Sequence, residues 1–195
     1  LRQTSGPVLE KPKDLAALLT HVAAQGDAPL WMVGHSYGGH AFGLLPGVER
    51  IDRFATFATG AGWHGWMPWA EQVRVRFMWR LLGPLIVRAK GYLAWSLLGM
   101  GEDLPRAVCM QWRHWCQWPR YFFDDPEQTH LAAEFASVNI PIRAINASDD
   151  AWAPPSSRDA FMAAYSQASV EAITVEPQSL GMTSIGHMGY FRPQA

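Results

Sequence analysis

Four side chains in three separate stretches of the sequence could together perform nucleophilic catalysis. They are Ser36, the adjacent carboxylates Asp149 and Asp150, and His187. A serine hydroxyl is a poor nucleophile until a base takes its proton, and a histidine can do this near neutral pH. A carboxylate next to the imidazole would hold its tautomer and stabilise the imidazolium ion. These residue types therefore predict acyl transfer through an activated serine.

The serine lies in a strand–turn–helix pattern. An apolar run over residues 30–33 predicts a buried strand, Gly34-His35-Ser36-Tyr37-Gly38 follows at once, and a helix is expected from about Gly38. A sharp turn of this kind lifts the hydroxyl clear of the backbone in a strained conformation. Gly34 and Gly38 lack a Cβ, so we expect close packing on both sides. The N–H of Tyr37 would be one donor to an oxyanion.

The elements around these residues predict an α/β class with a mostly parallel sheet. Because residues just past the carboxyl ends of parallel strands meet at one edge of a sheet, the serine, the carboxylates and the histidine should converge there. His35 is expected in the turn and His40 in the following helix, neither as a base. The expected strands cover residues 28–33, 51–57, 140–146 and 170–175, and the expected helices include 13–24, 38–45 and 156–165, the last with Ser156 as its cap.

With these motifs in view, the sequence resembles the α/β-hydrolase superfamily over residues 13–192. Residues 34–39 match its serine elbow, residues 146–150 its acid turn and residues 186–187 its histidine loop. Residues 99–105 and 185–192 are similar to a group of bacterial predicted α/β hydrolases, classed with serine aminopeptidase-like and lysophospholipase-like enzymes. The chain order serine, acid, histidine is also that of the superfamily. The resemblance implies a catalytic Ser36 and His187, with Tyr37 in the oxyanion hole.

The choice between the two carboxylates rests on their neighbours. In the superfamily a glycine commonly stands three residues before the acid, and Asn146 takes that place if the acid is Asp149. A proline commonly stands four residues after it, and Pro154 would then point to Asp150. We favour Asp149 as the third catalytic residue and keep Asp150 as the alternative.

The middle of the chain differs in composition from its ends. Residues 63–118 hold eight of the ten tryptophans and predict helices over 69–82, 84–98 and 104–118, broken at Gly83-Pro84, Gly99 and Gly101, with no clear strand pattern. We therefore expect a hydrolase core over 1–61 and 136–195 and a helical cap over 62–135. Most of these aromatic side chains are expected in the core, and some could line an apolar substrate pocket. The cationic side chains of the cap could meet a carboxylate or phosphate, or form solvated helix faces: Arg74, Arg76, Arg80, Arg88 and Lys90.

The composition excludes several other classes of protein. Apolar residues make up 49% of the 195 residues and charged residues 17%, which is typical of a globular domain. A net charge of −1 gives no reason to expect a nucleic acid as a partner. No apolar run reaches the roughly 18 residues of a membrane span. The free thiols expected at Cys109 and Cys116 favour a cytoplasmic protein, and His114 with Cys116 is too small a set to predict a metal. We expect no cofactor.

The expected function is hydrolysis of a small-molecule carboxylic ester with an apolar acyl or alcohol part, and less readily of an amide. Members of the superfamily have further strands before the serine, and an early loop there supplies a second oxyanion donor. Residues 1–29 offer neither, so we expect a piece of a longer protein with weak activity by itself. The alternatives are a non-catalytic binding protein with this fold and an acyltransferase that uses the same acyl-enzyme.

Overall fold

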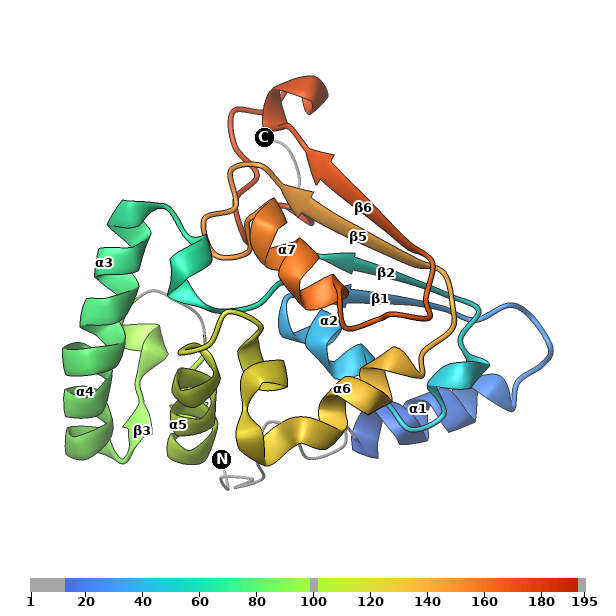
Figure 1. Cartoon of the computed structure of the whole chain (residues 1–195), viewed down its shortest axis with the longest axis horizontal. Coiled ribbons are helices and arrows are strands. Elements are labelled where there is room, and N and C mark those ends of the chain that lie inside the picture. Colours follow the sequence, from blue (N-terminus) through green and yellow to red (C-terminus); the bar gives the residue numbers. More distant parts are fainter. Residues whose placement is uncertain (1–12, 99–101, 193–195) are drawn as a thin grey trace.

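A four-stranded parallel sheet is the centre of the computed structural model, which describes residues 13–98 and 102–192 (Figure 1). The strands lie in the order β1 (Trp31–His35), β2 (Arg53–Phe57), β5 (Ile142–Ala147) and β6 (Val170–Val175). In the register, Ala55 of β2 is opposite Val33 of β1 and Arg143 of β5. The expected α/β class with a parallel sheet is confirmed. The breaks expected at Gly99 and Gly101 lie outside the described residues.

One face of this sheet carries the main hydrophobic core. Alternation along the strands directs Phe54, Ile142 and Ala144 to the same face, where all three are buried. Helices α2 (Tyr37–Phe42), α6 (Thr129–Ala136) and α7 (Pro155–Met162) supply Phe42, Phe135 and Phe161 to the same cluster. The rings of Phe42 and Phe54 stack with their centres 3.8 Å apart. The amphipathic helix α1 (Lys13–Ala23) contributes only partly buried side chains to this core.

A second hydrophobic cluster lies beside the sheet, among the elements on the left of Figure 1. Its buried side chains include Trp79, Trp95 and Met78. The chain there forms α3 (Trp69–Phe77), a π-helical turn (Met78–Leu82), α4 (Gly83–Lys90), an antiparallel pair of β3 (Tyr92–Leu93) with β4 (Leu104–Pro105), and α5 (Arg106–Trp115). Short 3₁₀ turns complete the described chain: Val48–Arg50, His64–Trp66, Trp95–Leu98, Tyr121–Asp124, Pro126–Gln128 and Pro177–Leu180.

Several local predictions in this region and in α7 are wrong. The helix expected over 84–98 ends at Lys90, because Gly91 takes the left-handed conformation that closes a helix, and β3 follows. Gly83-Pro84 does not break the preceding helix, which continues through the π-helical turn. Ser156 does not cap α7, whose N-cap is Pro154.

The interior divides at a different place from the expected cap boundary. Trp115, Tyr121 and Leu131 lie within residues 62–135 but are buried in the same cluster as the sheet. The separate cluster draws its buried members from residues 67–109. The division into a core and a cap at residues 61/62 and 135/136 stays a prediction.

Among the described residues, no helix is both long enough and apolar enough to cross a lipid bilayer.

Candidate active site

Ser36 stands in a strained turn between β1 and α2. Its backbone has φ 51° and ψ −115°, a conformation that residues other than glycine rarely adopt. The Ser36 N–H donates to the carbonyl of Phe57 at 2.9 Å, and its own carbonyl accepts from Gly39 N and Thr59 Oγ1, each at 3.0 Å. The turn is thus tied to the end of β2 on one side and to its own helix on the other. This arrangement agrees with the strained elbow expected from the sequence.

Two glycines, Gly34 and Gly39, make the turn possible, and only Gly34 belongs to the pair that the sequence predicted. A Cβ on Gly34 would lie 2.8 Å from backbone atoms of Gly38, which is closer than real contacts allow. A Cβ on Gly38 would meet nothing within 4 Å, so the prediction of close packing at Gly38 is wrong. The crowded position is Gly39, where a Cβ would overlap the side chains of Thr56 and Thr59. Those two hydroxyls also hydrogen-bond to each other.

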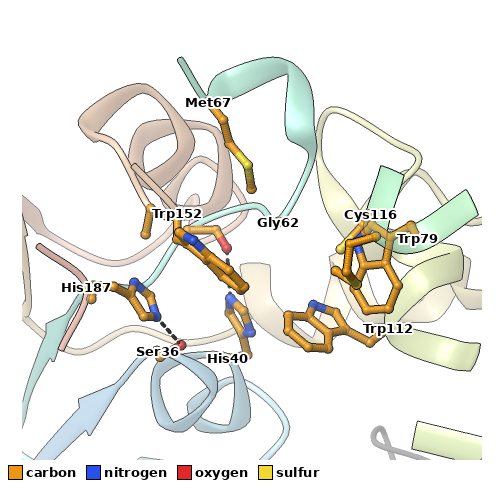
Figure 2. Close-up of a pocket in the computed structure, with 13 residues that line it drawn as sticks. Ser36, His40, Gly62, Met67, Trp79, Trp112, Cys116, Trp152 and His187 are labelled. Carbon is orange, nitrogen blue, oxygen red and sulfur yellow. Dashed lines mark hydrogen bonds between the residues drawn. The ribbon is translucent and has the colours of Figure 1, made fainter. Parts of the chain in front are cut away.

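His187 lies within hydrogen-bonding distance of both Ser36 and a carboxylate. Its Nε2 is 3.0 Å from Ser36 Oγ, and its Nδ1 is 3.0 Å from Asp150 Oδ2 and 3.2 Å from Oδ1 (Figure 2 shows the contact with Ser36). An ionised carboxylate only accepts, so Nδ1 carries the proton and Nε2 has the free lone pair that accepts from the serine hydroxyl. The structure therefore brings Ser36 and His187 together in the row that a base-activated nucleophile requires.

The carboxylate at the imidazole is Asp150, and the choice of Asp149 is wrong. Asp150 is buried, and its Oδ1 also accepts from the N–H groups of Trp152 and Ala153 at 2.9 and 3.0 Å. A turn in which Asp150 N donates to Ala147 O directs the second carboxylate inward. The proline spacing in the sequence pointed to this residue, while Asn146 at the glycine position pointed away from it.

Asp149 instead holds the loop that carries His187. Its carboxylate accepts from Ser184 Oγ at 2.7 Å, Ile185 N at 2.9 Å and Gly186 N at 3.0 Å. Burial alone would raise the pKa of Asp149, but these hydrogen bonds together lower it, so the group stays ionised. The two adjacent carboxylates thus hold two ends of the same segment, residues 184–187. Asp149 binds its first residues, and Asp150 binds the imidazole of His187.

Two further residues that the sequence analysis did not assign to the site support the histidine loop. His35, directly before the serine, donates from Nε2 to the carbonyl of His187 at 2.8 Å. The hydroxyl of Tyr190 accepts from the N–H of Ala147 at 2.5 Å, and burial raises the pKa of Tyr190 to about 12. Both residues lie within the matched motifs, but only their long-range partners identify their role.

His40 is buried one helical turn after the serine and takes part in neither proton transfer nor support of the loop. Its Nε2 donates to the carbonyl of Gly60 at 2.9 Å, which leaves Nδ1 as an acceptor. Burial, with a smaller effect from the nearby His187, lowers the pKa of His40 to about 4, so the ring is neutral near pH 7. The expectation that His40 is a helix residue and not the base agrees with this position.

Two cavities open at the serine hydroxyl. The smaller has a volume of about 60 Å³ and is lined by aromatic and sulfur-containing side chains around His187, including Trp79 and Trp152 (Figure 2). The larger, about 390 Å³, is an apolar groove that runs along Leu104, Val108 and Tyr121. Ser36, His40 and Trp112 border both cavities. The smaller cavity is lined by Ser36, His40, Ala58, Gly60, Gly62, Met67, Met78, Trp79, Trp112, Cys116, Trp152, Ala153 and His187. The larger is lined by Ser36, Tyr37, His40, Leu104, Val108, Trp112 and Tyr121.

Backbone strain concentrates around the same two cavities. Within residues 13–98 and 102–192, the residues other than glycine with positive φ are Ser36 (51°), Ala58 (52°) and Tyr121 (61°). Ala58 lines the small cavity, Tyr121 lines the groove and Ser36 lines both. Strain of this kind persists only where the surrounding structure imposes it, and it is typical of functional sites.

The cationic side chains of the expected cap are not part of this site. Arg74, Arg76, Arg80, Arg88 and Lys90 are exposed, and none of them lines either cavity. Arg74 pairs with Glu71 at 2.6 Å. The structure favours solvated helix faces over a binding site for a carboxylate or phosphate.

The two candidate metal ligands of the sequence, His114 and Cys116, are not joined by a third ligand in the described residues. Both cysteines are free and buried, and His114 Nε2 lies 3.4 Å from Asp125 Oδ2. In the part of the chain that the structure describes, no three His, Cys, Asp or Glu side chains are grouped so that they could hold a metal ion.

The comparisons with known proteins bear on the fold. No protein-family model matches the chain. A monoacylglycerol lipase from Paleococcus ferrophilus is similar over 99% of this chain and 72% of its own, with a TM-score of 0.52 and 10% sequence identity. A Mycobacterium tuberculosis protein described as a non-heme bromoperoxidase, BpoC, is similar over 92% of this chain and 66% of its own, with a TM-score of 0.50 and 18% identity.

A third solved structure gives the same result. The protein Rv0554 from Mycobacterium tuberculosis is similar over 97% of this chain and 68% of its own, with a TM-score of 0.52 and 19% identity. The chain thus spans about two thirds of the length of these proteins. The serine turn, the parallel sheet and these structural neighbours together establish that the chain has the α/β-hydrolase fold.

Proposed function

We propose that the chain is a serine hydrolase that cleaves a carboxylic ester through an acyl-serine intermediate. The observation that carries the proposal is the hydrogen-bonded row of Ser36, His187 and Asp150, with 3.0 Å between Ser36 Oγ and His187 Nε2. A monoacylglycerol lipase among the structures of the same fold is consistent with it. An ester is preferred to an amide as the substrate because an alcohol leaves more readily than an amine.

The first half of the reaction forms the acyl-enzyme. Ser36 Oγ attacks the carbonyl carbon while its proton passes to His187 Nε2. The backbone N–H of Tyr37 is the proposed donor to the oxyanion. When the tetrahedral intermediate collapses, the bond to the alcohol oxygen breaks and His187 returns the proton to that oxygen.

The second half releases the acid. Water attacks the acyl carbon, gives a proton to His187 Nε2, and displaces Ser36 Oγ, which takes that proton back. Asp150 accepts the Nδ1–H throughout, which orients the imidazole and stabilises the imidazolium ion. Two backbone N–H groups on its Oδ1 fix this orientation.

The proposal is tested with a fluorophosphonate probe, which phosphonylates an activated serine and releases fluoride. We expect the probe to label Ser36 and the chain to release acid from methyl esters in a pH-stat assay. Ser36→Ala should abolish both, while Ser156→Ala, which removes an exposed serine on α7, should change neither. A folded protein in which Ser36 resists the probe and esters are not cleaved contradicts the proposal.

The same assay separates the two alternatives. An acyltransferase would also label at Ser36 but would pass the acyl group to an added alcohol in preference to water, so product analysis with competing methanol distinguishes it. A non-catalytic binding protein would neither label nor turn over. We expect labelling and hydrolysis with water as the dominant acceptor.

A further inference from the structure

The two cavities at Ser36 border different parts of the proposed catalytic machinery. The small cavity is lined by His187 and by Trp152, whose ring centre lies 6.0 Å from that of His187. The apolar groove does not border His187 but borders Tyr37, the residue that follows the nucleophile. Since the two spaces meet at Ser36, a substrate bonded to the serine can extend one part into each.

The chemistry of the leaving group decides which part enters which space. His187 Nε2 must protonate the alcohol oxygen as it leaves, so the alcohol has to lie on the side of the imidazole. The acyl carbon is bonded to Ser36 Oγ, and its chain then extends away from His187. This places the alcohol in the small cavity and the acyl chain in the apolar groove.

The sizes of the two spaces translate this placement into a substrate class. A cavity needs on the order of 15 Å³ to hold one water molecule. The small cavity of about 60 Å³ therefore holds roughly four groups of that size, which is enough for a small alcohol. The groove of about 390 Å³ is more than six times larger and can take an extended apolar chain. Its side chains Leu104, Val108 and Trp112 offer apolar surface to such a chain.

Trp112 of α5 borders both spaces. In Figure 2 it stands beyond His40 as seen from His187. Its ring contacts Trp79 edge-on with centres 5.1 Å apart and Trp95 with centres 5.9 Å apart, so these neighbours hold it in place. Trp112 also packs against both hydrophobic clusters of the protein. A side chain held in this way can limit what passes from one cavity to the other.

From these contacts we infer that the site takes esters of a small alcohol with a medium-length apolar acyl chain, and that Trp112 and Val108 determine this specificity. The inference rests on the proposed function, because it uses the acyl-serine geometry. It goes beyond that function in assigning each half of the ester to one cavity.

Two series of esters test the assignment. In methyl esters from acetate to octanoate, each methylene taken out of water should raise kcat/KM up to about fourfold, and we expect roughly 50-fold or more between the ends of the series. In octanoate esters from methyl to hexyl alcohol, kcat/KM should instead fall by roughly tenfold once the alcohol outgrows the small cavity. The reverse pattern, with long alcohols and short acyl chains preferred, overturns the inference.

Three variants on helix α5 locate the determinants. Val108→Trp should fill the groove and lower the octanoate-to-acetate ratio by roughly tenfold. Trp112→Ala should join the two spaces and remove the discrimination between methyl and hexyl alcohols, and Trp112→Phe should keep most of it. Met110→Trp adds the same side chain at an exposed position of α5 and should leave both ratios unchanged. Thermal unfolding of each variant establishes that it is folded.

The outcomes separate this inference from the proposed function. If Ser36 is labelled and esters are cleaved but Val108→Trp leaves the acyl series unchanged, the assignment is wrong and the proposed function stands. If Ser36 is not labelled, the function fails, and binding of octanoate to the Ser36→Ala protein by calorimetry still examines the groove. There we expect tenfold weaker binding with Val108→Trp added, and equal binding contradicts the acyl groove.

Discussion

The turn that holds Ser36 and the loop that holds His187 reach the same site by different physical means. Around Ser36 the chain is positioned by close packing, with Gly34 against the backbone of Gly38 and Gly39 against two threonine side chains. Around His187 it is positioned by polar side chains from other elements, chiefly Asp149 and His35. The first region therefore depends on small residues and the second on specific hydrogen-bonding groups.

The difference predicts how each region responds to substitution. Close packing leaves no space for an added atom, so a change at the serine turn should act on folding stability and, through it, on activity. Hydrogen bonds at a half-exposed loop can be lost singly while the fold persists, so a change there should act on catalysis alone. Substitutions in the two regions can therefore be compared by measuring stability and kcat/KM in parallel.

The largest effect is expected at the carboxylate that meets the imidazole. Asp150→Asn keeps the size of the side chain and an oxygen to accept from Trp152 and Ala153, but it removes the charge that fixes the Nδ1–H tautomer. We expect kcat to fall by about 10³–10⁴-fold with little change in KM. Ester hydrolysis and thermal unfolding, measured side by side, check this.

The result also decides between the two adjacent carboxylates. If Asp149→Asn lowers kcat more than Asp150→Asn does, the positions of the two side chains in the structure do not represent the working enzyme. A large loss of stability in the Asp150→Asn protein would equally remove the contrast between the two regions, because the histidine side would then resemble the serine side.

The second effect, on stability, is expected at the serine turn. Gly39→Ala introduces a Cβ that overlaps the buried hydroxyls of Thr56 and Thr59, and we expect a loss of about 1–3 kcal/mol in the free energy of unfolding. Gly38→Ala, on the neighbouring residue, meets no atom within 4 Å and is the matched control. Chemical denaturation of both variants checks the pair.

Equal stability of these two variants would contradict the packing account. It would mean that the turn relaxes around an added methyl group at Gly39. A loss at Gly38 but not at Gly39 would instead restore the expectation drawn from the sequence motif alone.

The same contrast explains how much of the site could be predicted from the sequence. The serine turn is local: an apolar strand, a fixed spacing of glycines and a helix lie within about 16 consecutive residues, so its geometry follows from sterics at neighbouring positions. The strand predicted over residues 170–175 likewise has the same bounds in the structure, because β-forming residues dominate that stretch. Local patterns of this kind carry their own structural information.

The histidine side depends on contacts that no local pattern contains. Which of two adjacent carboxylates turns inward depends on the turn after β5 and on N–H groups at residues 152 and 153. The support from His35 joins residues 152 positions apart in the sequence. The tryptophans of the cavity gave only a composition signal, since the sequence does not distinguish Trp112, which lines the cavities, from Trp115, which is buried in the main core.

The smallest effect is expected at Asp149, and it tests whether the histidine loop depends on its polar contacts. Asp149→Asn weakens three hydrogen bonds to Ser184, Ile185 and Gly186 and leaves the imidazole with Asp150. Because the loop can still reach its position but holds it less often, we expect kcat/KM to fall by roughly 10-fold, with stability changed by no more than about 1 kcal/mol.

Glu176→Gln is the matched control for this change, because it removes the charge of an acidic side chain that accepts from Ser148 at 2.5 Å in the same region and touches no part of the histidine loop. The lowered pKa of Asp149 adds a pH signature. The hydrogen bonds to this carboxylate are present above its ordinary pKa and are lost only as the pH falls through the lowered value, so Asp149→Asn should cost as much activity at pH 5 as at pH 8. An equal loss of activity in the Glu176→Gln protein would assign the effect to net charge, and the loop would then owe its position to packing, as the serine turn does.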